Sequence, residues 1–467
     1  MLVEAWLPRA AAARPDRTAL DTPAGTLTYA ELMAAASAAA AALGARGVRR
    51  GERVAIALAP GLDFAVALHA CMLLGAVAVP VDLRLSSSER SAITAGCALE
   101  LDGDAGAATP DDVAGTMPPD GAAGAGRAGR EPASAFAGHE LDATAVVIHT
   151  SGTSAAPKPV ELTYGNLLWS ALGSAVALGL DQDERWLCAL PLSHVGGLSI
   201  LVRSAIYATT AVVHERFETE RALAALRERR ITLVSLVATT LARLLDAGLE
   251  RPPSLRGALT GGGPVPAALV QRARRAGVPV SLTYGLTESC SQVTTAPVAA
   301  LAEGDCGAGP PLFCTRVRIA PAPSPQGGGE ILVAGPTVAP GALDADGWLH
   351  TGDLGALDER GRLSVLGRKA DTIISGGENV VPGEVEAVLE AHPDVLEAAV
   401  VGLPDERWGE AVSAIVVARP GSAPAEESLR AHCAAALAPY KVPKRVLIRA
   451  EALPRTRSGK LLRRELR

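Results

Sequence analysis

The chain has 467 residues, more than one hydrophobic core usually serves, so at least two domains are expected. Aromatic residues make up only 3% of it and the net charge is −6, which argues against stacking on single-stranded nucleic acid and against a basic surface for polyanions. Seven cysteines without CxxC spacing indicate neither a zinc site nor a disulfide framework. The N-terminus lacks the pattern of a secretory signal, so a reduced, cytoplasmic setting is expected.

The first hundred residues contain a strand, a helix and a second strand in succession. Short apolar runs at 54–58 and 76–81 predict buried strands, and the run at 62–74 predicts the helix between them. This order indicates parallel pairing through a right-handed crossover, as in layered α/β proteins. The 18 uncharged residues 64–81 are long enough to suggest a membrane span, but Gly75 inside them favours a helix, a turn and a strand.

The rest of the chain divides into three patterns. Residues 102–138 are dominated by Gly, Ala, Pro and Asp, so we expect a surface excursion there rather than core. From 143 to 283 short strands and helices alternate, whereas after 328 short strands and turns precede a βαββα-like unit. The predicted fold class is α/β, with a large N-terminal domain (1–367) of layered, mostly parallel sheets, helices and a small β-rich subdomain. A small, mobile α+β C-terminal domain (368–467) follows.

Small and hydroxyl residues gather in HTSGTSAAPKPV (149–160), between a predicted strand and a later helix. Such a loop lets backbone amides and hydroxyls surround phosphate oxygens while a lysine adds a cation. It is not a Walker A loop, because no Gly-Lys-Ser/Thr sequence follows. An ordinary Ser/Gly/Pro loop is the alternative. The residues that we assign to phosphate binding are Thr150, Ser151, Gly152, Thr153 and Lys158.

A second motif, YGLTES (284–289), follows a predicted strand. Thr287 and Glu288 therefore lie at the carboxyl end of that strand, where open α/β sheets bind ligands. A surface turn is the alternative interpretation of this hexapeptide. The glycine-rich turn at 261–264 follows the preceding predicted strand, and its glycines allow a ligand to approach the backbone closely.

Three more motifs lie in the last third of the chain. TGDLG (351–355) presents Asp353 between two glycines, and a plain turn aspartate is the alternative there. GRKADTIISGGENV (367–380) follows at the predicted domain boundary. PRTRSGKLLR (454–463) places Lys460 on a Gly-supported turn, where a compact charge on a long stem can reach a reaction centre.

Taken in this order, the five motifs resemble those of the adenylate-forming superfamily of acyl-CoA synthetases, luciferases and peptide-synthetase adenylation domains. The resemblance extends over residues 145–460, with the loops in the family's order and approximate spacing. It implies an ATP-dependent acid:CoA ligase, which forms an acyl-adenylate from an acid and Mg-ATP and then a thioester with coenzyme A. The implied cofactors are therefore ATP, Mg²⁺ and coenzyme A, the last as a co-substrate.

The resemblance also implies roles for particular residues. The expected catalytic residues are Lys460, His194, Thr287 and Glu288. Glu288 is also the expected magnesium ligand, in agreement with the preference of this ion for carboxylate and phosphate oxygens. Besides the phosphate loop, the residues expected to bind ATP or coenzyme A are Gly262, Gly263, Pro264, Tyr284, Gly285, Asp353, Arg368, Ser375, Gly376, Gly377 and Glu378.

The chain departs from the family's pattern in two places. The phosphate loop has Ser154, Ala155 and Lys158-Pro159 where the family usually has a Thr or Ser, a Gly and Lys-Gly. The hinge position, usually Asp or Lys two residues after the arginine, is Ala370. This substitution puts any charge-based control of domain rotation in doubt, although a small residue can still absorb a backbone change.

Residues 187–217 carry the substrate signal. Their Pro-Leu-x-His-x-x-Gly sequence, with a basic residue nine positions after the His, resembles the o-succinylbenzoate:CoA ligases, the menaquinone-pathway subgroup of the superfamily. An acid with a second carboxylate on an aromatic ring needs a cation deep in its pocket, and Arg203 is the candidate. Ser193 and His194 are the other expected substrate-binding residues. The alternatives are a solvated arginine on a helix face and a buried structural histidine.

The expected function is therefore o-succinylbenzoate activation for menaquinone biosynthesis. A CoA ligase for another aryl or medium-chain acid and a non-catalytic nucleotide-binding paralogue are the alternatives. The expected partners are a small carboxylic acid, ATP and coenzyme A, with no nucleic acid and no membrane span. The oligomeric state is left open between a monomer and a homo-oligomer. His69, His214 and His350 are interpreted as structural.

Overall fold

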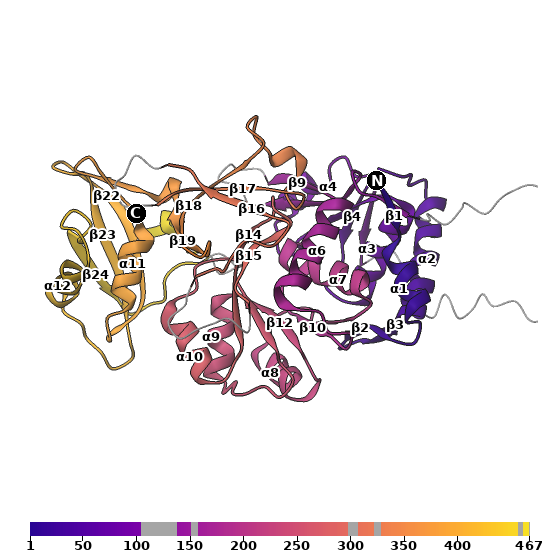
Figure 1. The fold of residues 1–467 in the computed structure, drawn as a ribbon, viewed down its shortest axis with the longest axis horizontal. Helices are drawn as coiled ribbons and strands as arrows, with labels where there is room; N and C mark the ends of the chain where they lie inside the picture. Colours follow the sequence, from indigo (N-terminus) through magenta and orange to yellow (C-terminus); the bar gives the residue numbers. More distant parts are fainter. Residues whose placement is uncertain (104–137, 151–156, 298–306, 322–327, 456–460, 467) are drawn as a thin grey trace, which may run out of the picture.

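The structure, a computed structural model, describes residues 1–103, 138–150, 157–297, 307–321, 328–455 and 461–466. Figure 1 shows an elongated molecule, with the N-terminal part of the chain at one end and the C-terminal part, in orange and yellow, at the other. Among the described residues, no helix combines the length and the hydropathy that a bilayer span requires. Most of the predicted surface excursion at 102–138 lies outside the described residues.

The largest sheet has eight strands. Its inner strands are parallel, and an antiparallel strand lies at each edge. In sheet order the strands are β15 (Ser291–Thr295), β14 (Val280–Leu286), β13 (Gly257–Thr260), β12 (Leu233–Leu236), β10 (Arg185–Cys188), β11 (Thr210–Val213), β2 (Thr18–Thr22) and β3 (Gly25–Thr28).

A second, five-stranded sheet contains the predicted strand–helix–strand unit. Its order is β6 (Leu99–Asp102), β4 (Arg53–Ala57), β5 (Val77–Pro80), β8 (Thr144–Thr150) and β9 (Lys158–Thr163). β4 and β5 are parallel and are joined by α3 (Leu62–Leu74), as the sequence predicts. Gly75 ends this helix in the left-handed conformation, with φ 71°, so the uncharged stretch is a helix, a turn and a strand.

Helices fill the space between the two sheets and cover their outer faces. One core joins both sheets through the middle helical layer, and separate cores lie beneath the outer helices. The middle helices are α1 (Trp6–Ala13), α2 (Tyr29–Ala45), α3, α6 (Tyr164–Leu178) and α7 (Val195–Tyr207). The outer helices are α4 (Ser87–Thr94) on the five-stranded sheet, and α8 (Thr219–Glu228), α9 (Ala238–Asp246) and α10 (Ala267–Arg275) on the eight-stranded sheet. This confirms the predicted layered α/β architecture.

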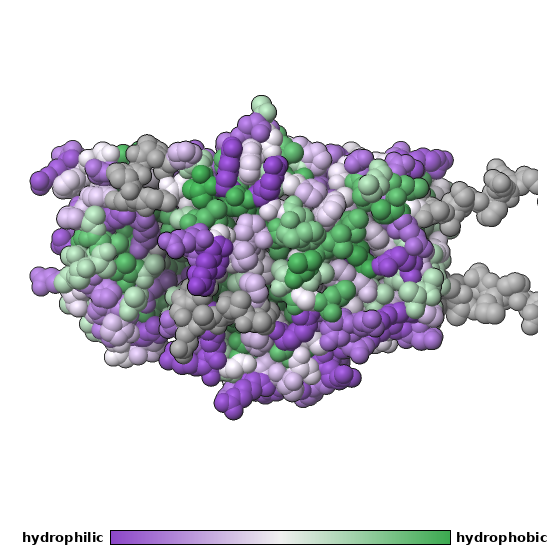
Figure 2. All heavy atoms as spheres, viewed as in Figure 1, coloured by the Kyte–Doolittle hydropathy of each residue, from purple (hydrophilic) through white to green (hydrophobic). Residues whose placement is uncertain are grey.

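Local sequence explains why these helices begin where they do. Thr28 caps α2, because its hydroxyl accepts a hydrogen bond from the backbone amide of Glu31. In turn, the Glu31 carboxylate accepts one from the backbone amide of Thr28. A short ribbon of β1 (Leu2–Glu4) and β7 (Gly138–Glu140) holds the N-terminus next to α1. Apolar residues also remain at the surface of α6, and Figure 2 shows them over the part of this face where Figure 1 places α6 and α7.

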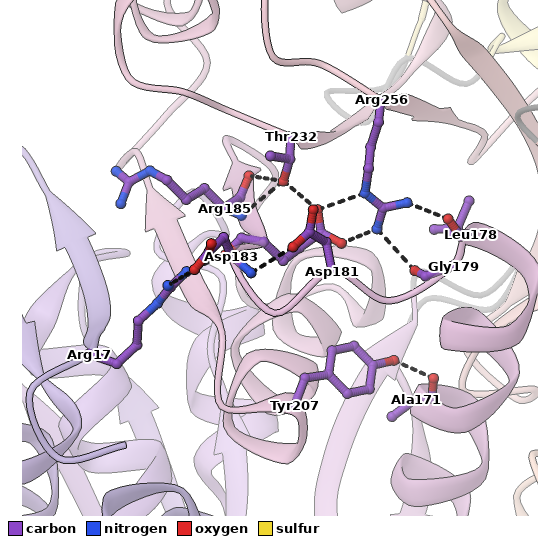
Figure 3. Close-up of polar contacts among 11 residues, drawn as sticks. Arg17, Ala171, Leu178, Gly179, Asp181, Asp183, Arg185, Tyr207, Thr232 and Arg256 are labelled. Atoms are coloured by element: carbon purple, nitrogen blue, oxygen red, sulfur yellow. Dashed lines mark hydrogen bonds and ion pairs between the residues drawn. The ribbon is translucent and has the colours of Figure 1, made fainter. Parts of the chain in front are cut away.

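At the amino ends of the parallel strands, a buried ion pair joins the beginnings of β10 and β13. Glu184 is only 1% exposed and accepts from Nε of Arg256 at 3.0 Å and from the hydroxyl of Thr232. Figure 3 shows the Arg256 guanidinium also reaching the backbone of Leu178 and Gly179 at the end of α6. This network therefore fixes strands and helix together at the edge opposite the carboxyl ends.

The β-rich subdomain is a four-stranded antiparallel sheet of β16 (Arg316–Ile319), β17 (Gly329–Ala334), β18 (Leu349–Leu357) and β19 (Leu363–Arg368). The pattern of short strands and turns after residue 328 predicts separate strands at 347–350 and 354–357. That expectation is wrong, since β18 runs through both segments. Gly352 has a positive φ, and the pairing of β18 with β17 and with β19 shifts register nearby. These irregularities accommodate the glycine within one continuous strand. The short helix η2 (Pro340–Ala342) precedes β18.

The last hundred residues form a five-stranded sheet with helices on one face and the tail on the other. The predicted βαββα-like unit begins with a hairpin instead of a single strand, because β21, which the sequence pattern missed, pairs antiparallel with β20. After η3 (Lys369–Asp371) come β20 (Ile373–Ser375), β21 (Glu378–Val380), α11 (Pro382–Glu390), β22 (Val395–Asp405), β23 (Gly409–Ala418), α12 (Glu426–Ala436), β24 (Arg445–Arg449) and η4 (Arg463–Leu466).

Candidate active site

The carboxyl ends of the parallel strands gather the predicted site residues at one edge of the eight-stranded sheet. Ser193 and His194 follow β10, the glycine turn follows β13, and Thr287 and Glu288 follow β14. Because β10, β12, β13 and β14 are parallel neighbours, these segments lie on the same side of the sheet. The structure thus brings together residues that are about a hundred positions apart in the chain.

The turn after β13 requires glycine at two positions. A Cβ atom at Gly261 would lie 2.6 Å from the carbonyl oxygen of Thr283 on the neighbouring strand, and Gly262 has a φ of 80°. A Cβ at Gly263 would meet no atom of the described residues within 4 Å, so with respect to them the turn is open on that side. The predicted residues Gly262, Gly263 and Pro264 therefore present backbone rather than side chains beside β14.

The YGLTES segment turns sharply between β14 and β15. A Cβ at Gly285 would lie 1.6 Å from the carbonyl oxygen of Ser291, so only glycine fits this bulge. The backbone oxygen of Glu288 accepts from the amide of Ala339 at 2.8 Å, which holds the turn against the segment before η2. Within the described part of the chain, no hydrogen bond or ion pair engages the Glu288 carboxylate, which is therefore available to a cation.

Tyr284, Asp353 and Arg368 meet where β14 approaches the β-rich subdomain. Asp353 and Arg368 are cross-strand partners in β18 and β19, and Nε of Arg368 lies 3.0 Å from Oδ1 of Asp353. The Tyr284 hydroxyl donates to Oδ2 of the same carboxylate at 2.8 Å. Burial, and then the Asp353 charge, raises the pKa of Tyr284, so the phenol stays protonated as a donor. The carboxylate is thus held in one orientation, which suits hydrogen bonds to a pair of sugar hydroxyls.

Two of the phosphate-loop candidates, Thr150 and Lys158, lie where β8 and β9 pair. Thr150 ends β8 and Lys158 begins β9; the two are antiparallel partners, and the Thr150 hydroxyl donates to the Lys158 carbonyl at 3.3 Å. Ser151, Gly152 and Thr153 lie outside the described residues. The predicted order of strand, loop and helix is incomplete, because β9 intervenes before α6. Helix α6 begins at Tyr164, so its N-terminal amides do not directly follow the loop.

Helix α7 carries two of the expected substrate residues. His194 is its N-cap residue, and Asp82, which follows β5, lies close enough for the two charges to interact. Partial burial raises the pKa of Asp82, but hydrogen bonds from Arg84 and the charge of His194 outweigh it, so the net shift is downward. Sequence reasoning missed Asp82, although its position directly after the predicted strand at 76–81 is a signal that could have found it.

Arg203 lies in the middle of α7 and is only 2% exposed. Its Nη2 donates to the hydroxyl of Ser170 on α6 at 3.0 Å, and its guanidinium carbon lies 5.6 Å from the centre of the Trp186 ring. Its Nε is buried without a hydrogen-bond partner, and no carboxylate in the described residues pairs with it. Burial lowers its pKa. The alternative of a solvated arginine on a helix face is therefore wrong.

A buried cation without a counter-charge is costly, because the guanidinium has lost its water and gained only one hydroxyl and one aromatic face. Contacts from neighbouring elements fix the helix around it. The Tyr29 hydroxyl donates to the carbonyls of Ser204 at 2.6 Å and Thr209 at 2.7 Å, and Figure 3 shows Tyr207 donating to Ala171 on α6. An anionic group that reached this guanidinium would supply the missing counter-charge.

The remaining candidates lie in the C-terminal sheet. Ser375, Gly376, Gly377 and Glu378 form the tip of the β20–β21 hairpin. Gly376 donates to the Trp408 carbonyl at 2.8 Å, and a Cβ there would lie 2.8 Å from the indole ring, so a side chain would displace the hairpin. Lys460 lies outside the described residues.

Three comparisons with known proteins bear on this arrangement. The sequence matches the AMP-binding enzyme family over residues 7–343 and the AMP-binding enzyme C-terminal domain over residues 384–460. A 2-succinylbenzoate–CoA ligase of Bacillus subtilis is 40% identical over 483 aligned positions, covering 99% of this chain and 97% of that protein.

Solved structures agree with the sequence comparison. The o-succinylbenzoate CoA synthetase of Bacillus subtilis, in complex with its acyl-adenylate intermediate, matches with a TM-score of 0.85 and 38% identity, covering 100% of this chain and 98% of that one. The same synthetase in complex with ATP and a magnesium ion matches with a TM-score of 0.84 and 39% identity, covering 100% of both chains.

Proposed function

The chain belongs to the AMP-binding enzyme family, and on that basis we propose that it is an ATP-dependent acid:CoA ligase whose acid is o-succinylbenzoate. Similarity over nearly the full length to 2-succinylbenzoate–CoA ligase supports the reaction type and the acid. In the first half-reaction the acid attacks the α-phosphorus of ATP to give an acyl-adenylate and pyrophosphate. In the second, the thiol of coenzyme A displaces AMP.

The observation that carries the choice of acid is Arg203. A buried guanidinium with no carboxylate partner in the described residues matches an acid that brings a second carboxylate of its own. The Ser170 hydroxyl holds one edge of the guanidinium, while Nε remains available for a hydrogen bond. We assign Ser193 and His194, at the start of the same helix, to the reacting end of the acid.

The nucleotide is assigned to the edge of the sheet where the glycine turn and β14 end. Asp353, oriented by Tyr284 and Arg368, accepts from the ribose hydroxyls, and the turn of Gly262, Gly263 and Pro264, together with Gly285 near the end of β14, is assigned to the base. Thr287, with the loop from Thr150 to Lys158, is assigned to the phosphates. Catalysis in this half-reaction rests on positioning and on neutralising charge.

Glu288 is the proposed ligand of Mg²⁺, and its unengaged carboxylate fits that role. No cluster of three metal-binding side chains occurs among the residues that the structure describes. This agrees with Mg²⁺, which is commonly held by one or two carboxylates together with substrate phosphates. Glu288 would hold the ion next to the bound nucleotide, where the ion would neutralise phosphate charge.

We place the boundary between the two domains at residues 367–368, at the end of β19. The C-terminal domain carries Lys460 for adenylation, and it presents the hairpin from Ser375 to Glu378 to coenzyme A after it rotates. The absence of a spanning helix in the described residues and the small-molecule substrates fit a cytoplasmic location.

The test is a panel of acids given to the purified full chain with ATP, Mg²⁺ and coenzyme A. We expect AMP and thioester with o-succinylbenzoate at a kcat/KM at least about 100-fold above benzoate, coumarate and octanoate. A preference for another acid would overturn the assignment of o-succinylbenzoate, while the conclusion that the protein is an acid:CoA ligase would stand. No AMP release with any acid would overturn the enzyme and favour the non-catalytic paralogue.

A further inference from the structure

The tail of the chain is attached to the C-terminal domain by a network that centres on one arginine. Arg463, in η4, has side-chain exposure of only 20%, and its Nη2 lies 2.7 Å from both carboxylate oxygens of Glu386 on α11. Its Nη1 donates to Oδ2 of Asp371 in η3 at 3.2 Å. One guanidinium therefore joins the tail, a helix and the connector that follows Arg368.

The other end of the same tail segment is fixed as well. Arg455 pairs with Glu397 on β22 at 3.1 Å, and its backbone forms an isolated antiparallel bridge with Leu461. The amide of Leu462 donates to the carbonyl of Pro454 at 2.8 Å. The chain before residue 456 and the chain after residue 460 therefore lie side by side, with an arginine-to-glutamate pair on each.

The partners of Arg463 belong to rigid elements. Oε1 of Glu386 also accepts from the amide of Val400 on β22 at 2.8 Å, so this carboxylate is bound from two sides. Burial raises the pKa of Glu386 even though Arg463 opposes the shift, and Glu390 nearby has a pKa raised to about 7 by burial and then by Glu386. Arg463 is thus a nearby cation in a group of carboxylates that would otherwise repel one another.

We propose that Arg463 is a positioning residue for the adenylation half-reaction: it holds the foot of the segment that carries Lys460 against α11 and against the connector at Asp371. The inference rests on the proposed function, since Lys460, three positions before Arg463, matters only if the chain adenylates an acid. A lysine on a long stem acts on a developing charge only from a defined base, and a misplacement of about 1 Å can cost about 100-fold in rate.

Arginine is needed at this position because its fork serves two carboxylates on different elements. A lysine ammonium is a single point charge and cannot hold the planar, two-sided geometry. The neighbouring Arg464 is exposed and provides a matched control of the same charge. The partner Glu386 provides a second variant that breaks the same contact from the other side.

The experiment measures the two half-reactions separately in the full-length protein. For Arg463→Gln and Glu386→Gln, we expect acid-dependent ATP–pyrophosphate exchange to fall about 100-fold in kcat, with the KM values for ATP and acid little changed. Thioester formation from supplied acyl-adenylate and coenzyme A should stay within about threefold of the wild type, since Lys460 is not used there. Arg464→Gln should retain both rates, and Arg463→Lys should recover part of the exchange.

The double variant Arg463→Gln/Glu386→Gln should be no worse than Arg463→Gln alone, because that single substitution already removes the contact with Glu386. If both half-reactions fall equally and the melting temperature falls with them, Arg463 serves folding alone and the proposal is overturned. Full exchange activity in Arg463→Gln would also overturn it. Exchange is measured with whichever acid the wild type adenylates. A wrong acid therefore overturns only the proposed substrate, and a wild type that adenylates none overturns both proposals.

Discussion

Three charged side chains of the candidate site differ in how the surrounding chain engages them. Asp353 is held by a tyrosine and an arginine, so its orientation is set before any ligand binds. The Glu288 carboxylate has no partner in the described residues, and Arg203 is a buried cation that only a hydroxyl and an indole face contact there. Substitution of each residue should therefore leave a different kinetic signature.

Arg203→Leu should raise the KM for o-succinylbenzoate by about 30-fold or more and leave the KM for ATP nearly unchanged. Removal of one partner of a desolvated charge pair costs about 2 to 5 kcal/mol, and the second carboxylate of this acid would lose that partner. The KM for benzoate, which lacks the second carboxylate, should hardly change. Steady-state kinetics with both acids measures this, and equal losses on the two would remove Arg203 from the acid pocket.

The same variant should fold at least as well as the wild type, because leucine replaces a buried cation that has no carboxylate partner in the described residues. Thermal unfolding checks this point. The exposed Arg216→Leu is the matched control, and it should change neither KM.

Glu288→Gln should depress adenylation, and additional Mg²⁺ should partly restore it. The amide keeps the shape of the side chain but loses the charge that holds a hard cation. The check is pyrophosphate exchange measured across a Mg²⁺ titration, with thioester formation from supplied acyl-adenylate as the control that should change little. If the variant and the wild type show the same Mg²⁺ dependence, another residue is the ligand.

At the scale of elements, a buried histidine pair, His69 and His139, lies where α1, α3, α6 and β7 pack together. His139 on β7 stacks on Tyr164 of α6, with ring centres 4.3 Å apart, and accepts from the amide of Trp6 at 3.3 Å. Burial lowers the pKa of His69 on α3 to about 4, and burial and then His69 lower that of His139 to about 4. The burial of His69 fits the structural role predicted for it, and both histidines must stay neutral for these elements to pack.

These histidines should make the protein lose stability as the pH falls. Their pKa values are lower in the folded state than the usual 6.5, so the unfolded chain binds more protons below that value. Stability from this source is complete above about pH 6.5 and is lost down to about pH 4, by up to about 2 to 3 kcal/mol for each histidine. Urea unfolding at pH 7 and pH 4.5 measures the loss.

His69→Met should reduce that loss, because the thioether fills an apolar site and takes up no proton. The control is His350→Gln, which changes a histidine on the surface beside Asp346 and should follow the wild type. If His69→Met loses as much stability as the wild type between pH 7 and pH 4.5, His69 is not the cause of that loss.

At the scale of the whole molecule, the C-terminal sheet lies against the β-rich subdomain that contributes Asp353. A Cβ at Gly383 in α11 would lie 2.2 Å from the carbonyl oxygen of Leu366 in β19, so the two parts approach closely there. Lys369 also pairs with Glu330 of β17 at 3.1 Å, one position before Ala370. A charge therefore acts across this connector even though the hinge position itself is neutral.

Lys460→Ala should abolish acyl-adenylate formation and largely spare thioester formation from supplied acyl-adenylate. The ammonium is needed only where charge develops on the α-phosphate and the acid, and the loss of one preorganised charge costs about 100- to 1,000-fold or more. ATP–pyrophosphate exchange and single-turnover thioester formation separate the two steps. Equal impairment of both would exclude a lysine that serves one half-reaction and would favour a structural role for the tail.

Local signals in the sequence determined much of the fold and the position of the site. The apolar runs around Gly75 predicted a parallel strand pair, because buried strands joined by one helix have few other arrangements. Gly262, Gly285, Asp353 and Arg368 were identified through motifs that resemble those of the family, and the close backbone approach at Gly285 shows why that motif needs a glycine there. The spacing of apolar residues, the residues that form turns and the motifs themselves are each contained in a short stretch of the chain, so the sequence alone was sufficient to identify them.

Tertiary structure decided which of these side chains lie in water and which lie in the core. Arg203 has the same residue type whether it is solvated or buried, and only the packing of α7 against α6 and β10 removes its water. The extra strand β9, the Glu184–Arg256 pair and the attachment of Arg463 to Glu386 likewise depend on contacts between segments far apart in the chain. Burial and long-range pairing depend on both of the segments that come into contact, and therefore no single stretch of sequence specifies them.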